Sequence, residues 1–314
     1  MKSQPLVSII IPAHNAGMFI GEAIDSALSQ FYAAVEVVVV DDGSTDGTSE
    51  VLRTYGRAIT SWSQTRSGQS AAINRGVSLA SGELIAYLGA DDRLHESAIE
   101  ILVDRLAHEH AMCLVYPDFN LIDTNGAVIR RVSASPYDQR RLIAGFRCLP
   151  GPGALMRKTA WSRCGGWSSS FRQIPDMDLY FRLSLIGPFA RVPHCLADFR
   201  VHPESTTRKP SSYDMANEPV QLVDEFFART DLPDDVRRWE NEARASALAL
   251  SGFLHATGSR RSLAVRQFTQ AIRLNARVAL SREFMSYSVR SLSAIPPLGA
   301  LRSMHPFFFK MIRW

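Results

Sequence analysis

The strongest constraint on the fold of this 314-residue chain comes from two apolar runs that each lead into a pair of aspartates. Residues 35–40 are followed directly by Asp41-Asp42, and residues 84–88 reach Asp91-Asp92 after two small residues. Runs this rich in apolar side chains, interrupted only by Glu36, are typical of strands buried on both faces, as in a parallel sheet. Ligands of open α/β sheets bind outside the carboxyl ends of strands, so these aspartates are predicted to lie at a binding site.

Strands and helices alternate along the first 110 residues. Residues 6–11 are rich in β-branched side chains and predict a strand that Pro12 ends. Apolar residues then recur at helical spacing up to residue 30, before the run at 35–40. This alternation predicts a Rossmann-like, doubly wound α/β sheet. A tight turn at 123–126 predicts a hairpin, so the sheet is expected to be mixed in its second half.

The last third of the chain differs in pattern and charge. From Tyr213 onward apolar residues recur at helical spacing, which predicts a helical extension over 213–314 after an α/β domain over 1–212. Residues 237–314 hold 13 Lys and Arg against 3 Asp and Glu, whereas the whole chain has a net charge of only +4. Residues 303–314 combine aromatic and cationic side chains. This composition suits peripheral contact with an anionic membrane surface, or a solvated Arg-rich face whose aromatic end packs on the domain.

Composition argues against several other classes of protein. No apolar run of about 18 residues occurs, so no membrane-spanning helix is expected. The four cysteines show no C-x-x-C spacing and are interpreted as reduced thiols, and the first residues run into a strand without a signal peptide. These features predict a cytoplasmic protein, at the inner face of the cell membrane if the basic tail binds lipid. No motif of a nucleic-acid-binding fold appears.

Four segments occur in the order and spacing of a known family. They are Val7-Ser8-Ile9-Ile10-Ile11-Pro12-Ala13-His14-Asn15, Val38-Val39-Val40-Asp41-Asp42-Gly43-Ser44-Thr45-Asp46-Gly47-Thr48, Ala72-Ile73-Asn74-Arg75-Gly76 and Leu88-Gly89-Ala90-Asp91-Asp92. Together they resemble the family 2 glycosyltransferases over residues 5 to about 206. The resemblance implies the GT-A fold and an inverting, metal-assisted transfer of sugar from a nucleotide-diphospho-sugar. It further implies a UDP-linked donor and a hydroxyl acceptor on a glycan or lipid-linked precursor.

The resemblance assigns the donor site to the first half of the chain. It implies that residues directly after the first strand line the nucleotide pocket and that Asp42 accepts a hydrogen bond from the base. It also implies that a later loop and helix flank the nucleoside and the sugar. The lining residues are Pro12, Ala13 and Asn15, and the flanking residues are Gly68 and Asn74. Two alternatives stay open: helix capping by members of the Asp41, Asp42 and Asp46 group, and a buried Asn74 amide that bridges the backbone.

The same resemblance implies that Asp91, with Asp92 beside it, holds Mg²⁺ or Mn²⁺ and the donor diphosphate. His202, in the closing Arg200-x-His202 motif, is implied to reach the metal or the diphosphate. The family's first aspartate of Asp-x-Asp is replaced by Gly89, which removes one carboxylate from the expected set. The alternatives are that Asp91-Asp92 form a turn capping the helix expected near Ser97, and that the histidine is structural.

Asp176 aligns with the family's general base, which takes the proton of the acceptor hydroxyl. The glutamate that usually precedes the base is replaced by Pro175, and helix capping is the alternative role for Asp176. Trp167, in a Gly-Gly-aromatic segment, is implied to stack on the acceptor sugar or else to belong to the core. Because Gly89 and Pro175 replace family acids, a catalytically silent nucleotide-sugar-binding subunit remains the alternative function.

Overall fold

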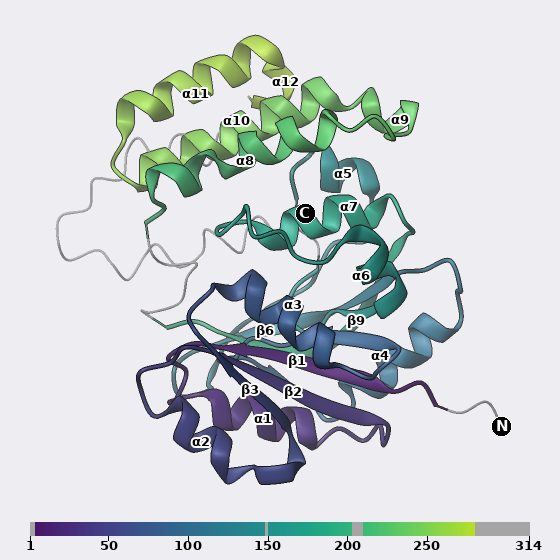
Figure 1. Ribbon diagram of the computed structural model, residues 1–314. Helices are drawn as coiled ribbons and strands as arrows, with labels where there is room; N and C mark the ends of the chain where they lie inside the picture. The colour runs from purple at the N-terminus through teal and green to yellow at the C-terminus, as the bar shows by residue number, and fades with distance from the viewer. Residues whose placement is uncertain (1–3, 148–149, 203–209, 280–314) are drawn as a thin grey trace.

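The computed structural model describes residues 4–147, 150–202 and 210–279 (Figure 1). Within these residues the strands form one mixed sheet in the order β3-β2-β1-β4-β8-β6-β9-β5, with β7 paired to β6. The strands are β1 (Val7–Ala13), β2 (Val35–Asp42), β3 (Thr60–Gln64), β4 (Leu84–Tyr87), β5 (Arg93–Leu94), β6 (Leu114–Ile122), β7 (Val128–Val132), β8 (Leu155–Arg157) and β9 (Phe189–Arg200).

The sheet has a parallel half and a mixed half. Strands β3, β2, β1 and β4 are parallel neighbours. Strand β8 then runs antiparallel to both β4 and β6, whereas β6 and β9 are parallel. The hairpin predicted around residues 123–126 joins β6 to β7. The predicted α/β class and the mixed second half are therefore confirmed.

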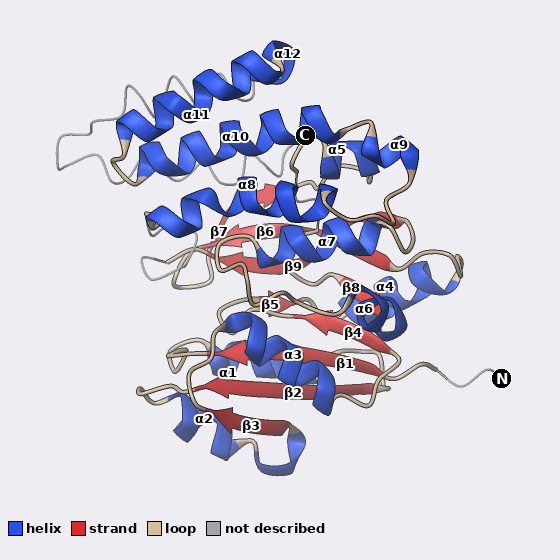
Figure 2. Ribbon diagram, turned by 45° about the horizontal axis from the view of Figure 1, so that its top comes forward, coloured by secondary structure: helices blue, strands red, loops and turns tan. Residues whose placement is uncertain are grey.

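Alternation along the central strands divides the core between the two faces of the sheet. Ile10, Val38 and Ile85 belong to one apolar cluster, and their neighbours Ile9 and Val37 belong to the other. The first face is covered by α3 (Gln69–Leu79), α5 (Gln139–Ile143), α6 (Lys158–Cys164) and α7 (Pro175–Ser184). The second is covered by α1 (Ile20–Leu28), α2 (Thr48–Thr54) and α4 (Ala98–Ala107), with the 3-10 turn η1 (Gly56–Ala58) before β3. Figure 2 shows this layering.

The predicted helical extension is confirmed over the described part of the chain. It comprises α8 (Tyr213–Phe227), α9 (Asp234–Arg237), α10 (Glu240–Thr257), α11 (Arg261–Leu274) and α12 (Ala276–Ala279). Helices α8, α10 and α11 stack beyond α7, on the side away from α1 and α2 (Figure 1). Leu222, Phe226 and Leu250 belong to the same apolar cluster as Ile10 of β1. The extension thus packs on the first face of the sheet, and the domain limit at 212/213 stays a prediction.

Two further expectations concern the C-terminal segment and membrane-spanning helices. The aromatic and cationic segment 303–314 lies outside the described residues. Among the helices that the structure does describe, none combines the length and apolarity needed to cross a bilayer.

Candidate functional site

The carboxyl ends of β1, β2 and β4 meet at one edge of the sheet, because these strands are parallel and in register. Ala13 at the end of β1 lies opposite Asp41, and Ile10 lies opposite Tyr87. Strand β1 continues through Pro12, so the expectation that Pro12 ends the strand is wrong. Pro12 pairs in register with Val40, and the turn begins only at His14. The edge therefore gathers the loops that follow three neighbouring strands.

Asp42 is buried at this edge and organises the loop after β3. Its carboxylate accepts hydrogen bonds from Gln64 Nε2 at 2.8 Å, from the Ser67 amide at 2.7 Å and from the Gly68 amide at 2.8 Å. Gly68 has a φ of 93°, a conformation that favours glycine. A carboxylate accepting backbone N–H groups in this way fixes the loop in one conformation. The predicted contact of Asp42 with a base stays a prediction.

Asp41 and Asp46 order the loop before α2, whose N-cap position is occupied by Gly47 without a side-chain cap. Asp41 accepts hydrogen bonds from the Ser44 amide at 3.0 Å and from the Ser49 hydroxyl at 2.7 Å. Asp46 accepts from the Thr48 amide at the start of α2 and from the Gly17 amide, both at 3.0 Å. Burial alone would raise the pKa of Asp46, but the hydrogen bonds from Thr48 and Gly17 lower it. Both aspartates therefore shape the loop.

Asn15 joins the loop after β1 to the loop after β2. It has a positive φ of 50°, which asparagine tolerates better than most residues. Its Oδ1 accepts a hydrogen bond from the Thr45 amide at 2.8 Å, and its own amide donates to Ser44 Oγ at 2.9 Å. The two loops form one wall of the site.

The Asp91-Asp92 turn follows β4. The Asp92 amide donates to Gly89 O at 3.1 Å and closes the turn, and Asp92 Oδ1 accepts from the Arg200 amide at 2.9 Å. Asp92 is buried, and both burial and the neighbouring Asp91 raise its pKa. The Asp91 side chain is one third exposed, and its Oδ2 lies 2.9 Å from His202 Nε2. The alternative that this pair caps a helix near Ser97 is wrong, because β5 intervenes and α4 begins at Ala98.

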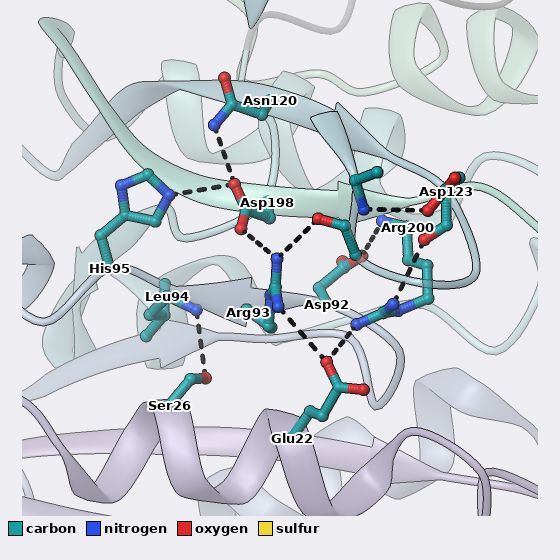
Figure 3. A network of polar contacts seen from close by, with 12 residues as sticks. Glu22, Ser26, Asp92, Arg93, Leu94, His95, Asn120, Asp123, Asp198 and Arg200 are labelled. Carbon is teal, nitrogen blue, oxygen red and sulfur yellow. Dashed lines mark hydrogen bonds and ion pairs between the residues drawn. The ribbon is translucent and has the colours of Figure 1, made fainter. Parts of the chain in front are cut away.

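Arg200 lies beneath this turn and is fully buried (Figure 3). Its Nε donates to Asp91 O at 2.8 Å, and its Nη2 lies 2.6 Å from Glu22 Oε2 on α1. Its Nη1 donates to the carbonyls of Asp123 and Thr124 in the β6–β7 hairpin. One guanidinium thus ties both α1 and the β6–β7 hairpin to the turn that carries Asp91. From the sequence alone, Arg200 was recognised only as the first residue of the closing motif.

Tyr87, the last residue of β4, brings Asp91, Asp92 and Asp176 into one neighbourhood. Burial raises its pKa, and the charges of these three carboxylates raise it further, so the phenol stays protonated in neutral solution. Tyr87 Oη accepts a hydrogen bond from Gln69 Nε2 at 2.9 Å. Gln69 directly follows Gly68, whose amide binds Asp42. Tyr87 is thus near enough to Asp91, Asp92 and Asp176 to feel their charges, and its hydrogen bond to Gln69 links it to the loop that Asp42 holds. Sequence reasoning missed Tyr87 and Gln69, although the position of Tyr87 at a strand end was the available signal.

Asn74 and Trp167 hold the segment beside Asp176. Asn74 Nδ2 donates to Trp167 O at 2.8 Å, and the Trp167 amide donates to Asn74 Oδ1 at 3.0 Å. A Cβ atom at Gly166 would come within 2.7 Å of Asn74 Oδ1, so a larger residue does not fit there. Trp167 is buried in the apolar cluster, and its ring centroid lies 5.5 Å from that of Tyr87. These contacts match the bridging-amide and core alternatives.

Asp176 lies in the first turn of α7 and is partly buried. Its Oδ1 accepts a hydrogen bond from the Met177 amide at 2.8 Å. Among the described residues, no group of three His, Cys, Asp or Glu side chains is arranged to hold a metal ion. Asp91 and His202 are the expected metal ligands that the structure brings into contact.

Comparison with known proteins agrees with this geometry. A family model described as "Glycosyl transferase family 2" matches residues 8–164. The chain is 30% identical over 233 residues to a chondroitin synthase of Escherichia coli, covering 73% of this chain and 34% of that protein. It therefore spans about a third of the length of that relative.

Two solved structures resemble the fold. One is S. aureus TarS 1–349 in complex with UDP-GlcNAc, with a TM-score of 0.68 and 16% identity, covering 92% of this chain and 88% of that chain. The other is the mannosyltransferase PcManGT from Pyrobaculum calidifontis in complex with GDP-Man and Mn²⁺. Its TM-score is 0.61 at 18% identity, and the match covers 93% of this chain and 85% of that chain. At these identities the likeness establishes the fold alone.

Proposed function

Because this chain belongs to glycosyl transferase family 2, we propose that it transfers a sugar from a nucleotide-diphospho-sugar to a hydroxyl group of a glycan or lipid-linked acceptor. The observation that carries the proposal is the position of Tyr87, within electrostatic reach of Asp91, Asp92 and Asp176. Carboxylates from the turn after β4 and from the first turn of α7 therefore act on the same phenol. A donor diphosphate and an acceptor hydroxyl meet there in the proposed reaction.

The donor nucleotide is proposed to bind along the loops after β1, β2 and β3. Pro12, Ala13 and Asn15 line one side, and Asp42 with the loop ending at Gly68 forms the other. The network from Asp42 to Gly68 holds this loop rigid, which reduces the entropy lost on binding. The TarS neighbour is bound to UDP-GlcNAc and PcManGT to GDP-Man, which supports a nucleotide-sugar donor. A uracil base is the finer part of the proposal.

A divalent cation is proposed to lie beside Asp91. The donor set fits this ion, because a partly exposed carboxylate and an imidazole nitrogen lie 2.9 Å apart and both are ligands that Mn²⁺ accepts. Asp91 and His202 would hold the metal, with Asp92 turned toward Arg200 behind them. A bound ion would neutralise negative charge on the departing diphosphate. PcManGT, which shares the fold, is bound to Mn²⁺.

Asp176 is proposed to be the general base. As the acceptor oxygen forms its bond to the anomeric carbon, the bond from that carbon to the diphosphate oxygen breaks on the opposite side, which inverts the configuration. The hydroxyl proton passes to the Asp176 carboxylate, and the nucleoside diphosphate leaves with the bonding electron pair. The phenol of Tyr87 stays protonated and offers a hydrogen-bond donor between the carboxylates.

Transfer from a panel of UDP- and GDP-sugars tests the function, with Asp176→Asn as the variant. We expect this substitution to lower turnover about 10²- to 10⁴-fold while UDP affinity stays unchanged. Asp104→Asn, at an exposed position of α4, is the matched control. Full activity of Asp176→Asn would remove the base assignment. UDP binding without turnover on any donor and acceptor would instead favour the silent nucleotide-sugar-binding subunit.

We also propose that the basic tail gives the protein peripheral contact with an anionic membrane, as a lipid-linked acceptor would require. The excess of Lys and Arg over residues 237–314 supports this, since each basic residue near such a surface adds about 1 kcal/mol. Co-sedimentation with phosphatidylserine vesicles should fall when residues 303–314 are removed. Equal binding of the full and shortened chains would overturn the proposal.

A further inference from the structure

Glu218, on α8 of the helical extension, is a buried carboxylate whose partners all lie in the segment that leads to Asp176. It is 5% exposed, and its Oε1 accepts a hydrogen bond from the Arg172 amide at 2.8 Å. Its Oε2 accepts from the Gln173 amide at 2.7 Å and from the Ile174 amide at 3.2 Å. One side chain therefore satisfies three successive backbone donors that lie more than 40 residues earlier in the chain.

Glu218 is the acceptor that the structure gives to three amides at and just before the N-cap residue of α7. Ile174 occupies the N-cap position and offers no side-chain oxygen, and Pro175 follows it as the first helical residue. The Arg172 and Gln173 amides precede the helix and the Ile174 amide belongs to its N-cap residue, so Glu218 orders the chain as it enters α7. Asp176 is the second residue of α7, two positions after the last amide that Glu218 holds. The direction in which α7 starts, and with it the position of Asp176, is thus set by a residue of the extension.

A second contact ties the same segment to the extension. Ser211 Oγ donates to Gln173 Oε1 at 2.9 Å, and Arg260 Nη2 donates to Ser211 O at 2.7 Å. Helix α8 also packs directly on α7, where the rings of Phe181 and Phe226 lie with centroids 5.2 Å apart (Figure 2). The extension therefore contacts the base-bearing helix at its start and along its length.

From this geometry we propose that Glu218 is a positioning residue that holds Asp176 in its productive place. The inference rests on the proposed function, since it assigns Asp176 as the base. Glu218 acts through the backbone of residues 172–174 and does not touch the substrate. The helical extension is thereby part of the catalytic apparatus.

Glu218→Gln is the informative substitution, because it keeps the size of the side chain and replaces one acceptor oxygen by a donor. The new amide group would face backbone N–H groups, so at least one of the three hydrogen bonds is lost. Glu225→Gln is the matched control, because it makes the same chemical change on the same helix at an exposed position. Circular dichroism and thermal melting establish that each variant is folded.

A double-mutant cycle separates positioning from a general loss of structure. We expect Glu218→Gln to lower kcat about 10- to 100-fold, as misplacement by about 1 Å can, with the affinity for UDP unchanged. Added to Asp176→Asn, the same substitution should lower the residual rate no further, because its effect passes through Asp176. Equal fractional losses in the wild-type and Asp176→Asn backgrounds would overturn the inference. So would wild-type kcat in Glu218→Gln.

A milder variant covers the case in which Glu218→Gln does not fold. Ser211→Ala removes the hydrogen bond to Gln173 and leaves Glu218 in place, and we expect a smaller fall in kcat with the same dependence on Asp176. A Ser211→Ala enzyme with unchanged kcat would, in that case, overturn the inference. If Asp176→Asn alone keeps full activity, the base assignment itself has failed. If Asp176→Asn is impaired while the Glu218 and Ser211 variants are not, only the positioning role has failed.

Discussion

His202 Nε2 lies 2.9 Å from Asp91 Oδ2, so the histidine that follows the last strand touches the carboxylate that follows β4. The two residues are brought together because Arg200, two positions earlier, donates from its backbone amide to Asp92 and from its Nε to Asp91 O. The ring of His202 also packs on Phe19, with centroids 5.1 Å apart. The position of His202 is therefore set from both sides.

If Asp91 and His202 hold a divalent cation, replacing either weakens donor binding only when metal is present. We expect Asp91→Ala and His202→Ala to lower UDP affinity in Mn²⁺ about 10- to 100-fold and to have a small effect in EDTA. Isothermal titration with UDP in both buffers measures this, and Asp104→Ala is the control on an exposed carboxylate. Unchanged affinity in Mn²⁺ would remove the metal assignment.

Replacing Arg200 should destabilise the whole protein. Arg200→Met leaves the carbonyls of Asp91, Asp123 and Thr124 without this donor and leaves Glu22 with only its longer contact to Arg93, which we expect to cost about 3 kcal/mol of unfolding free energy. Urea unfolding measures the loss. Arg53→Met, which breaks the exposed pair with Glu50, should change stability by less than about 1 kcal/mol. Equal effects of the two substitutions would contradict the hub role of Arg200.

Gly89 should resist replacement even by the aspartate that the family pattern carries. A Cβ atom there would come within 2.7 Å of Asp92 Oδ2 and 3.0 Å of Asp91 Oδ1, both part of a turn that Arg200 fixes. We expect Gly89→Ala to cost about 1–2 kcal/mol of unfolding free energy, and Gly89→Asp to cost more because it adds a third carboxylate. Gly47→Ala is the control, since no atom lies within 4 Å of its Cβ position. A stable Gly89→Asp variant with improved metal-dependent UDP binding would contradict this account.

The contact of His95 with Asp198 should make stability depend on pH (Figure 3). The hydrogen bond to Asp198 raises the pKa of His95, although burial opposes it. The stabilisation is therefore complete below the unfolded pKa of about 6.5 and is lost as the pH rises through the raised pKa of the folded state. Because His95 is 36% exposed, solvent screening limits the effect to about 0.5 kcal/mol.

His95→Gln should remove this part of the pH dependence, whereas His110→Gln, at an exposed position, should keep it. Urea unfolding at several pH values between about 6 and about 8 measures the difference. A His95→Gln protein whose stability falls with pH as steeply as the wild type would show that another group is responsible.

Much of this fold could be predicted because short stretches of sequence reveal its strands and helices. The apolar runs that became β2 and β4 reveal strands by their composition, and the rule for strand ends then places Asp42 and Asp91 at one edge. The contacts of Arg200 and Glu218 could not be predicted in the same way. Arg200 reaches its partners only because β9 lies beside β6 in the sheet, and Glu218 meets residues 172–174 only because α8 packs on α7.

Within the site, too, contacts between residues far apart in the sequence could not be predicted. The sequence is compatible with two roles each for Asn74 and Trp167, and the structural role becomes visible only in the pair of hydrogen bonds that joins them across 93 residues. Side-chain chemistry could be read from sequence, whereas the partners of each side chain depended on packing.

The apolar cluster that runs from Ile10 in β1 through Phe181 in α7 to Leu250 in α10 has a consequence for how this protein melts. On this face of the sheet, the strands, α7 and the helices beyond it each supply part of one packed volume. Calorimetry should therefore record a single endotherm, and a hybrid enzyme that borrows these helices from a homologue would keep its heat resistance only if α7 travels with them.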